Sequence, residues 1–205
     1  DSSVIMFQWA KTLCVSYDGG DTWIENDEIE ATPGTENWVA AGDSNLPGHG
    51  VRQDPRFPGQ LFLPCGENDY WVTTPDGGNV RSGMQAARRI PLGPDEYSCS
   101  DIAIHPLNTN IIYTLQFRQA NAGELLRSTD GGQTFQSIGV ALDWPPGTSK
   151  NDSIDQLCLT IEPDNPNNMY FCIPADAAVH GFTWDPQLGP RGIRKSANGG
   201  FTWSW

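Results

Sequence analysis

One eight-residue pattern recurs along the chain and limits its fold more than any other feature of the sequence. The pattern Ser-x-Asp-Gly-Gly-x-Thr-aromatic stands at residues 16–23 and 128–135, and residues 196–203 repeat it with Asn in place of Asp. A fourth copy at residues 74–80 keeps the Asp-Gly-Gly centre and loses the flanks. Such internal repetition indicates an array of similar structural units.

Each position of the pattern has a place in a tight turn between two strands. The Asp side chain accepts hydrogen bonds from backbone N–H groups of its own turn, and the two glycines allow positive φ. The Thr and the aromatic residue begin the return strand, so we expect Trp23 and Trp203 to be core residues. The pattern therefore predicts structural turn residues at Asp18, Asp76, Asp130 and Asn198.

A second repeated element precedes the turns. Residues 102–113, residues 159–170 and, more loosely, residues 51–62 each predict a strand, a polar Pro/Asn turn and a second strand. Together with the two strands that flank the Asp-Gly-Gly turn, this makes four strands per repeat, which is the unit of a β-propeller blade. The 22 Gly and 16 Pro residues agree with many short strands joined by turns.

We predict a single all-β domain over residues 1–205, a β-propeller with four-stranded antiparallel blades. About four blades are expected, at approximately residues 1–30, 51–84, 100–140 and 157–205. In the first blade, the expected strands at residues 4–9, 12–17 and 22–25 are the second, third and fourth, so its inner strand is missing. No spare strand completes it, which favours an arc of a larger propeller closed by blades from the same or another chain.

Composition excludes several classes of function. The net charge is −13, from 25 acidic residues against 12 Lys and Arg, which disfavours nucleic-acid binding and docking on anionic lipid. No apolar run approaches the roughly 20 residues needed to span a bilayer, so no membrane insertion is expected. The five Cys residues form no CxxC pair and the three His residues are scattered, so we expect neither a metal site nor a cofactor.

Two covalent modifications are suggested. Cys99 and Cys158 fall at the start of inner strands in adjacent predicted blades, which makes them the one pair to test as a disulfide. Residues 151–153 form an Asn-Asp-Ser sequon, which would permit glycosylation of Asn151 in a secretory pathway.

The repeated turns resemble Asp-box (BNR) repeats, which occur in sialidases, in sortilin-type receptors and in xyloglucanase-type glycoside hydrolases. Residues 45–55, and residues 182–186 followed by 192–196, are similar to segments of the xyloglucanase propellers. That resemblance implies a glucan cleft between two propellers, each supplying a catalytic Asp in a Thr-Asp-x-Gly-Gly motif. This chain has no such motif, and Glu67 is the nearest aligned position. Arg89-Ile90-Pro91 matches the sialidase Arg-Ile-Pro signature but follows two box-like turns, whereas the signature precedes the first turn in sialidases.

Propeller geometry places function on the loops that join second to third strands and that join successive blades. A glycosidase needs two carboxyls, about 5–5.5 Å apart for retention or about 6.5–9.5 Å for inversion. The loops offer three candidate catalytic carboxyls, namely Glu67, Asp69 and Asp176. They also offer aromatic rings that would stack on sugars, and we predict substrate binding by Trp38, Trp71, Trp144 and Trp184.

Three functional hypotheses remain open. The leading one is part of a secreted, extracellular glycoside hydrolase of xyloglucanase type, acting on a β-glucan-like polysaccharide. The second is a non-catalytic propeller that binds a glycan or a protein, as sortilin does. The third is a structural module in an extracellular assembly. The Asp-box is specific for the fold and does not decide between them.

Overall fold

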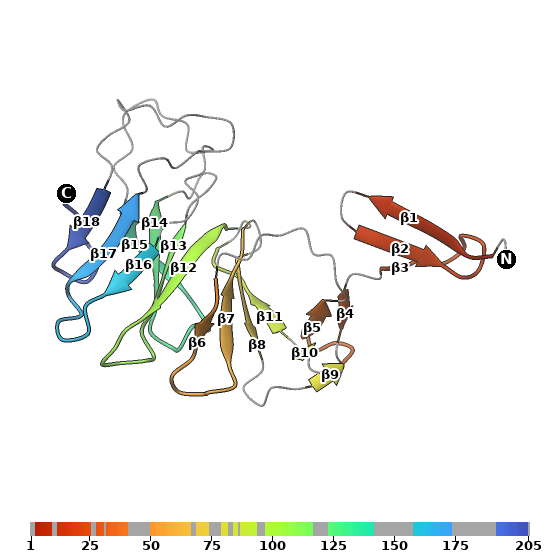
Figure 1. Ribbon diagram of the computed structural model, residues 1–205, viewed down its shortest axis with the longest axis horizontal. Coiled ribbons are helices and arrows are strands. Elements are labelled where there is room, and N and C mark those ends of the chain that lie inside the picture. Colours follow the sequence, from red (N-terminus) through yellow and green to blue (C-terminus); the bar gives the residue numbers. More distant parts are fainter. Residues whose placement is uncertain are drawn as a thin grey trace, which may run out of the picture.

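The computed structural model describes residues 3–9, 12–25, 28–30, 32–40, 50–66, 69–73, 79–81, 84–85, 87–93, 97–116, 123–141, 158–173 and 192–204. Within these ranges the regular structure consists of β-strands, and no helix is present (Figure 1). Neighbouring strands pair antiparallel, as predicted.

The most complete sheet is formed by four consecutive strands in the order in which they occur along the chain. Its strands are β12 (Cys99–Ile104), β13 (Ile112–Gln116), β14 (Glu124–Ser128) and β15 (Gln136–Val140). Every residue of β13 is buried, because sheets pack on both of its faces. The sheet has the four antiparallel strands expected of a propeller blade.

The preceding sheet has the same plan with additions. Its blade strands are β6 (Arg52–Gln53), β7 (Leu61–Pro64), β8 (Tyr70–Thr73) and β11 (Ala87–Ile90). Two further strands, β5 (Trp38–Ala40) and β4 (Glu28–Glu30), extend the sheet beyond β11. A separate hairpin of β9 (Asn79–Arg81) and β10 (Met84–Gln85) lies between β8 and β11 in the chain. This blade therefore extends to Ile90, past the predicted boundary at residue 84.

The sheets at the two ends of the chain have three strands each. The C-terminal sheet contains β16 (Cys158–Ile161), β17 (Met169–Ile173) and β18 (Gly192–Ser196), and Ser204 forms an isolated bridge with Lys195. The N-terminal sheet contains β1 (Ile5–Trp9), β2 (Thr12–Ser16) and β3 (Ile24–Glu25). These strands lie close to the ones predicted as the second, third and fourth of the first blade.

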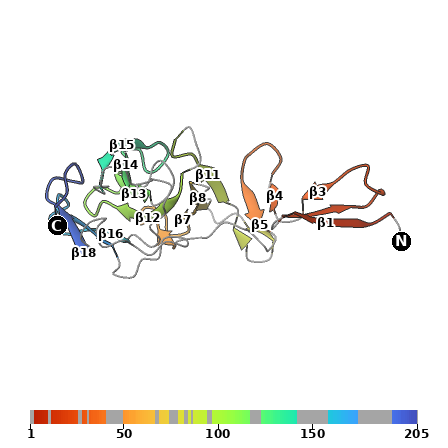
Figure 2. The same ribbon diagram turned by 90° about the horizontal axis from the view of Figure 1, so that it is seen from above.

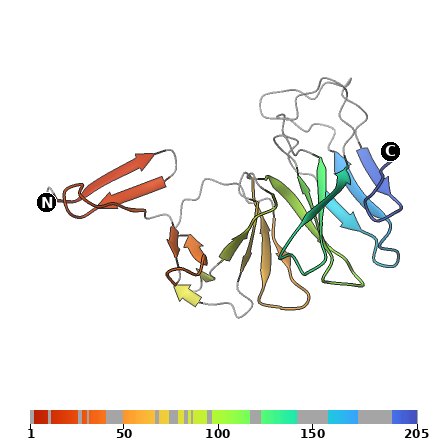
Figure 3. The ribbon, with the colours of Figure 1, turned by 180° about the vertical axis from the view of Figure 1, so that it is seen from behind.

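The core lies between successive sheets, which fan out side by side in Figures 1 and 3. One apolar cluster joins the β6–β11 blade to the β12–β15 blade, and it includes Phe62, Tyr70, Ile102 and Ile112. A second cluster joins β12–β15 to β16–β18 and includes Leu115, Leu125, Met169 and Phe171. This face-to-face packing of four-stranded antiparallel sheets is the blade arrangement of a β-propeller, and about four blades account for the chain.

Polar contacts reinforce the first of these interfaces. The Tyr70 hydroxyl donates to the carbonyl of Gly132, in the repeated turn of the next blade. The Arg56 guanidinium donates through Nη2 to the carbonyl of Gly131 (3.0 Å) and through Nη1 to Oδ1 of Asn110 (3.0 Å). Because Arg56 is also ion-paired with the buried carboxylate of Asp54, its position over the next blade is fixed.

The N-terminal sheet stands apart from the other sheets in all three views (Figures 1, 2 and 3). Ile5, Phe7 and Trp23 are exposed there. The prediction that Trp23 is a core residue is therefore wrong, because no sheet packs over the ring in the described structure. Trp203, at the equivalent position of the last blade, is partly buried against the core as predicted.

Candidate functional site

The three repeated turns share one hydrogen-bond network. In the second turn, the N–H of Gly132 donates to Ser128 Oγ (2.9 Å), and Ser128 Oγ donates to Asp130 Oδ1 (2.7 Å). The N–H of Thr134 donates to Asp130 Oδ1 (3.0 Å) and its hydroxyl to Oδ2 (2.6 Å). The turn centred on Asp18 repeats these contacts. The turn centred on Asn198 repeats all but the last, because the amide nitrogen of Asn198 donates to the Thr202 hydroxyl (2.9 Å). The Ser, Asp, Asn and Thr side chains of the pattern therefore form their hydrogen bonds within their own turns.

The same hydrogen bonds stabilise the ionised carboxylates. Donation from Thr22, first through its hydroxyl and then through its N–H, lowers the pKa of Asp18 to about 2. For Asp130, burial alone would raise the pKa, but hydrogen bonds from Thr134, Ser128 and Gln133 outweigh it and hold the pKa well below its ordinary value. Both carboxylates are charged at neutral pH, which disfavours a role as a general acid.

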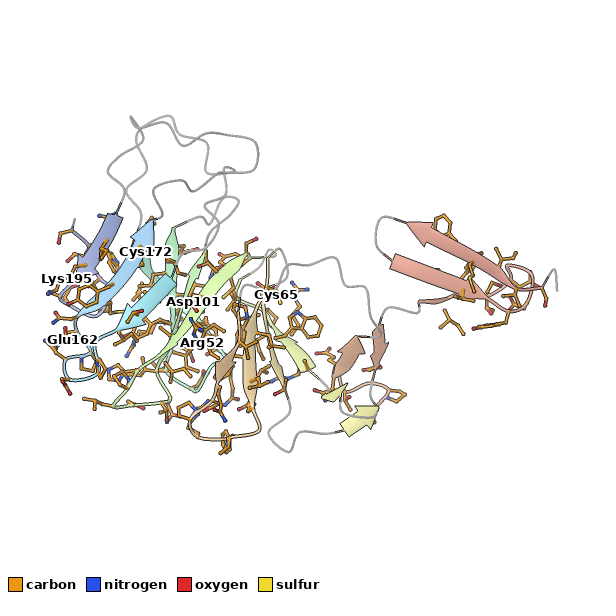
Figure 4. All side chains as sticks on the ribbon, in the orientation of Figure 1. Arg52, Cys65, Asp101, Glu162, Cys172 and Lys195 are labelled. Carbon is orange, nitrogen blue, oxygen red and sulfur yellow. The ribbon has the colours of Figure 1, made fainter. Side chains whose placement is uncertain are left out.

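The blades have two chemically different edges. The turn edge comprises residues 54–60, 105–111, 128–135, 162–168 and 196–203. Its turns are joined in pairs, since the N–H of Gly131 donates to the carbonyl of Asn110 and that of Gly199 to the carbonyl of Asn167, both at 2.9 Å. The loop edge lies at the opposite ends of the strands, and its described part comprises residues 64–66, 69–70, 91–93, 97–99, 116, 123–124, 140–141, 172–173 and 192. Figure 4 shows Cys65 and Cys172 toward the loop edge and Glu162 toward the turn edge.

A buried carboxylate organises the loop edge. Asp69 is fully buried, at positive φ (55°), and its Oδ2 accepts hydrogen bonds from Arg89 Nε (2.9 Å) and Nη2 (2.6 Å). Its Oδ1 accepts from the backbone N–H groups of Leu92 (3.2 Å) and Tyr97 (3.1 Å). The backbone of Asp69 adds bonds to Tyr97 (2.8 Å) and Cys65 (3.2 Å). Asp69 thus ties the β7–β8 connection to the β11–β12 connection.

This environment suits an anchor. A general acid or base needs a carboxyl that reaches the proton it transfers, whereas the oxygens of Asp69 face four protein donors. We therefore assign Asp69 a positioning role at the loop edge, and the catalytic role predicted from the sequence stays untested.

A second buried carboxylate joins the inner strands of three blades. Asp101, at a bulge in β12, pairs with Arg52 of β6 (2.7 Å) and accepts a hydrogen bond from the N–H of Leu159 in β16 (3.0 Å). Figure 4 shows Arg52 and Asp101 on neighbouring strands. Because the carboxylate binds both a guanidinium and a backbone N–H group, it joins the inner strands of the three blades.

The other predicted site residues are distributed unevenly. Trp71 lies in β8 with Leu63 and Arg89 as its strand partners, and it is partly buried. Trp38 belongs to β5, where it pairs with Ala87, and its side chain lies outside the described part. Five predicted positions lie outside the described residues, namely Glu67, Asp76, Trp144, Asp176 and Trp184. Within the described ranges no group of three or more His, Cys, Asp or Glu side chains could hold a metal ion.

The suggested disulfide between Cys99 and Cys158 is not present, since Cys99 is a free thiol. Its sulfur lies 3.4 Å from Thr114 Oγ1, and burial raises the pKa of this thiol far above its ordinary value. Cys158 stands opposite Cys172 within its own sheet, while the backbone N–H of Cys99 donates to Cys65 (3.0 Å). Cys99 is therefore bonded to the preceding blade through its backbone, whereas Cys158 is paired within its own sheet.

Sequence reasoning missed three residues that build these networks. In the sequence, Arg89 stands out only by its similarity to the sialidase signature; in the structure, its guanidinium is ion-paired with Asp69. Asp101 carried a signal, because a carboxylate within the inner strand at residues 100–104 requires a buried partner. The sequence gives no signal for Tyr97, because its contacts with Asp69 are made by its backbone and not by its side chain.

In comparisons with known proteins, no family model and no curated protein matches the chain. Among solved structures it resembles an ancestral GH74 enzyme (TM-score 0.49, 16% identity, covering 99% of this chain and 22% of that chain). It also resembles the GH74 xyloglucanase from Xanthomonas campestris (TM-score 0.44, 15% identity, 95% and 39%). A third structure is YCF48 from Cyanidioschyzon merolae (TM-score 0.43, 17% identity, 87% and 39%). The chain spans less than two fifths of each of these structures, and the likeness concerns the fold alone.

No helix in the described part of the chain has the length and apolar character that a membrane span requires.

Proposed function

We propose that this chain is part of an extracellular, carbohydrate-active propeller whose loop edge binds a polysaccharide. The observation that supports the proposal best is the network around Asp69. It fixes two successive connections at one edge through a buried ion pair and backbone bonds. A rigid loop edge is the type of support that binding groups require, because functional side chains work best when a scaffold holds them.

The connections that leave this edge carry the expected sugar-binding chemistry. Ile173 at the end of β17 pairs with Gly192 at the start of β18, so residues 174–191, with Asp176 and Trp184, begin and end at the loop edge. The connection from β15 to β16 contains Trp144. Indole rings offer a broad apolar face of the kind that lines ligand sites.

Hydrolysis of a β-glucan of the xyloglucan type is the more specific part of the proposal. The likeness of residues 45–55, and of residues 182–186 followed by 192–196, to xyloglucanase-type propellers supports it. Glu67 and Asp176 are the carboxyls that we propose as the catalytic pair. Asp69 stands two residues from Glu67 and would set the path of that loop.

One observation favours a second candidate, a non-catalytic glycan-binding propeller. Asp69, a carboxyl that the sequence offers for catalysis, is committed to four protein donors. Binding through aromatic rings needs no free carboxyl, so the loop edge would serve this function equally well.

Affinity electrophoresis in gels that contain xyloglucan or mixed-linkage β-glucan tests polysaccharide binding. The wild-type chain is expected to be retarded, and Trp144→Ala and Trp184→Ala should each weaken binding about tenfold, since one stacked ring contributes about 1–2 kcal/mol. Phe201→Ala is the matched control, because Phe201 is an exposed aromatic on the turn edge. Absence of retardation, or an equal loss for Phe201→Ala, would contradict the proposed binding face.

A reducing-end assay on the same polysaccharides separates the two candidates. If the chain is a hydrolase, Glu67→Gln and Asp176→Asn should abolish product release while retardation in the gel persists. If it binds without cleaving, the wild-type chain releases no reducing ends at any pH between 4 and 8.

A further inference from the structure

The third repeated turn contains an Asn-Gly pair, Asn198-Gly199, where the first two turns have Asp-Gly. It is the one Asn-Gly pair in the sequence. In a flexible chain an asparagine followed by glycine is prone to deamidation, because glycine has no side chain to hinder attack by its backbone nitrogen and its backbone rotates freely. The pair therefore gives this turn a chemistry that the other two turns lack.

Deamidation joins the Gly199 nitrogen to Cγ of Asn198. The bond between Cγ and Nδ2 breaks, and the proton of the Gly199 N–H leaves with Nδ2 as ammonia. Water then opens the cyclic succinimide, which leaves aspartate or isoaspartate at residue 198. The reaction needs a Gly199 nitrogen that can lose its proton and a carboxamide that can turn toward it, since the reacting atoms must first meet in the correct geometry.

The closed turn withholds both groups. The N–H of Gly199 donates to the carbonyl of Asn167 (2.9 Å) in the β16–β17 connection, which Figure 1 shows beside the turn after β18. Oδ1 of Asn198 accepts from the N–H of Thr202 (2.9 Å) and from the Ser196 hydroxyl (2.9 Å), and Nδ2 donates to the Thr202 hydroxyl (2.9 Å). These bonds must break before the reaction can begin, so it depends on local opening of the turn.

The first two turns have a further protection. In each, the N–H of the first glycine donates to a neighbouring carbonyl, as it does in the third turn. Their central residues, Asp18 and Asp130, are also ionised at neutral pH, because each has a pKa below its ordinary value. A carboxylate ion is a poor target for a nucleophile, whereas a carboxamide is a reactive one. Asn198 is therefore the reactive centre among the three turns.

We propose that Asn198 is a site of spontaneous deamidation that is gated by opening of the third turn, and that the aspartate product restores the turn of the other blades. An aspartate at residue 198 would accept at Oδ2 from the Thr202 hydroxyl, as the aspartates do in the other two turns. Isoaspartate lengthens the main chain by one carbon, so the hydrogen bonds of the turn cannot re-form around it. The proposal concerns the turn edge and is independent of glycan binding at the loop edge.

Peptide mapping of the aged wild-type chain is the first measurement. Tryptic cleavage after Lys195 releases residues 196–205, and chromatography with mass spectrometry distinguishes Asn, Asp and isoaspartate at residue 198 in that peptide. We expect deamidation in the folded chain at neutral pH to be at least about tenfold slower than in concentrated urea, because only the opened turn reacts. Equal rates in the folded and unfolded chains would overturn the proposal.

Variants of the turn test the gate directly. Ser196→Ala removes the hydroxyl that donates to Oδ1 and accepts from two backbone N–H groups of the turn, so deamidation of the folded chain should become about tenfold faster while the rate in urea stays the same. Thr202→Val removes only the hydroxyl that holds Nδ2 and should give a smaller increase. Ser204→Ala is the matched control, because the Ser204 hydroxyl lies in the same peptide and donates to the Lys195 carbonyl (3.4 Å), outside the turn.

Circular dichroism confirms that each variant retains its strands, and Thr202→Val carries the test if Ser196→Ala does not fold. Wild-type rates in both turn variants, or an equal increase in Ser204→Ala, would overturn the gate.

Asn198→Asp supplies the proposed product and tests the second half of the proposal. Its melting temperature at pH 7 should be no lower than that of the wild-type chain, because the aspartate can form every hydrogen bond of the Asp18 and Asp130 turns. Asn198→Ala, which lacks the acceptor, should melt at a lower temperature. If Asn198→Asp melts as low as Asn198→Ala, the aspartate product does not restore the turn.

Discussion

Asn198 shows which part of the repeated turn needs a charge. Its Oδ1 accepts from the N–H of Thr202 (2.9 Å) and from the hydroxyl of Ser196 (2.9 Å), as the aspartates do in the other turns. Its amide nitrogen then donates to the Thr202 hydroxyl (2.9 Å), so that hydroxyl accepts where Thr22 and Thr134 donate. The turn geometry therefore survives without the negative charge, and the charge adds a dependence on pH.

We expect the double variant Asp18→Asn, Asp130→Asn to be less sensitive to acid than the wild-type chain. Both aspartates have a lowered pKa in the fold, so each contributes stability above its ordinary pKa of 3.8 and loses it as the pH falls through the folded value, about 2 for Asp18. Melting temperatures at pH 5, 4, 3 and 2 measure the difference. Asp164→Asn, which removes an exposed carboxylate from the turn edge, is the control. Parallel curves for wild type and double variant would contradict this role.

The ion pair between Asp69 and Arg89 gives a second prediction. Asp69→Ala should destabilise the chain by about 3 kcal/mol, because it removes a buried carboxylate that binds a partly buried guanidinium and two backbone N–H groups. The double variant Asp69→Asn, Arg89→Leu should recover part of that loss, since no charge is then left uncompensated. Chemical denaturation measures both. A stable Asp69→Ala chain that has lost only activity would instead support the catalytic role.

The sequence predicts these residues to different degrees. The turn aspartates could be assigned because all their partners lie within four residues, so the local pattern contains the whole network. The partners of Asp69 lie 20 to 28 residues away, and the sequence carries no local mark that pairs them. A predicted catalytic carboxyl and an anchoring one look identical until the fold brings their partners together.

At the scale of elements, the repeated turns hold the blades against each other. Gly199 and Gly200 both have positive φ, 72° and 93°, but they differ in what surrounds them. A Cβ on Gly199 would have 3.8 Å of clearance from Asn167, whereas one on Gly200 would collide with Leu125 and press on Ile138 and Met169. The first glycine is needed for backbone shape alone and the second for shape and for packing.

We therefore expect Gly200→Ala to cost more than Gly199→Ala. The left-handed backbone alone costs about 1–2 kcal/mol for either alanine. Overpacking against Leu125 should add about 1–3 kcal/mol for Gly200→Ala. Urea unfolding of the two variants measures the difference directly. Equal losses would show that the turn does not bear on the preceding blade.

The strands were predictable where the repeat is regular and less so where it is interrupted. The blade of β12–β15 could be placed closely, because its strand pattern and its turn occur in full. In the β6–β11 blade, the β9–β10 hairpin stands in the chain where the fourth strand is expected from the repeat. The fourth strand, β11, therefore lies later in the chain than the sequence predicts. Trp23 was misplaced because burial of the ring depends on a neighbouring sheet, which the local pattern does not encode.

At the scale of the whole molecule, the turn edge and the loop edge of the blades have different roles. The polar side chains of the turn edge form hydrogen bonds within the turns and between blades. At the loop edge Asp69 is an internal anchor, and the connections of residues 142–157 and 174–191 begin and end there. The connections that contain Trp144, Trp184, Glu67 and Asp176 begin and end at the second edge, and this is why we propose a glycan-binding face there.

Hydrogen–deuterium exchange with and without a xyloglucan oligosaccharide tests this division most directly. Binding at the loop edge predicts slower exchange in peptides that cover residues 64–70, 91–99, 142–157 and 174–191. It also predicts unchanged exchange in the repeated turns at residues 16–23, 128–135 and 196–203. Protection of the turns, with unchanged exchange in the loop-edge peptides, would contradict a glycan-binding face on the loop edge.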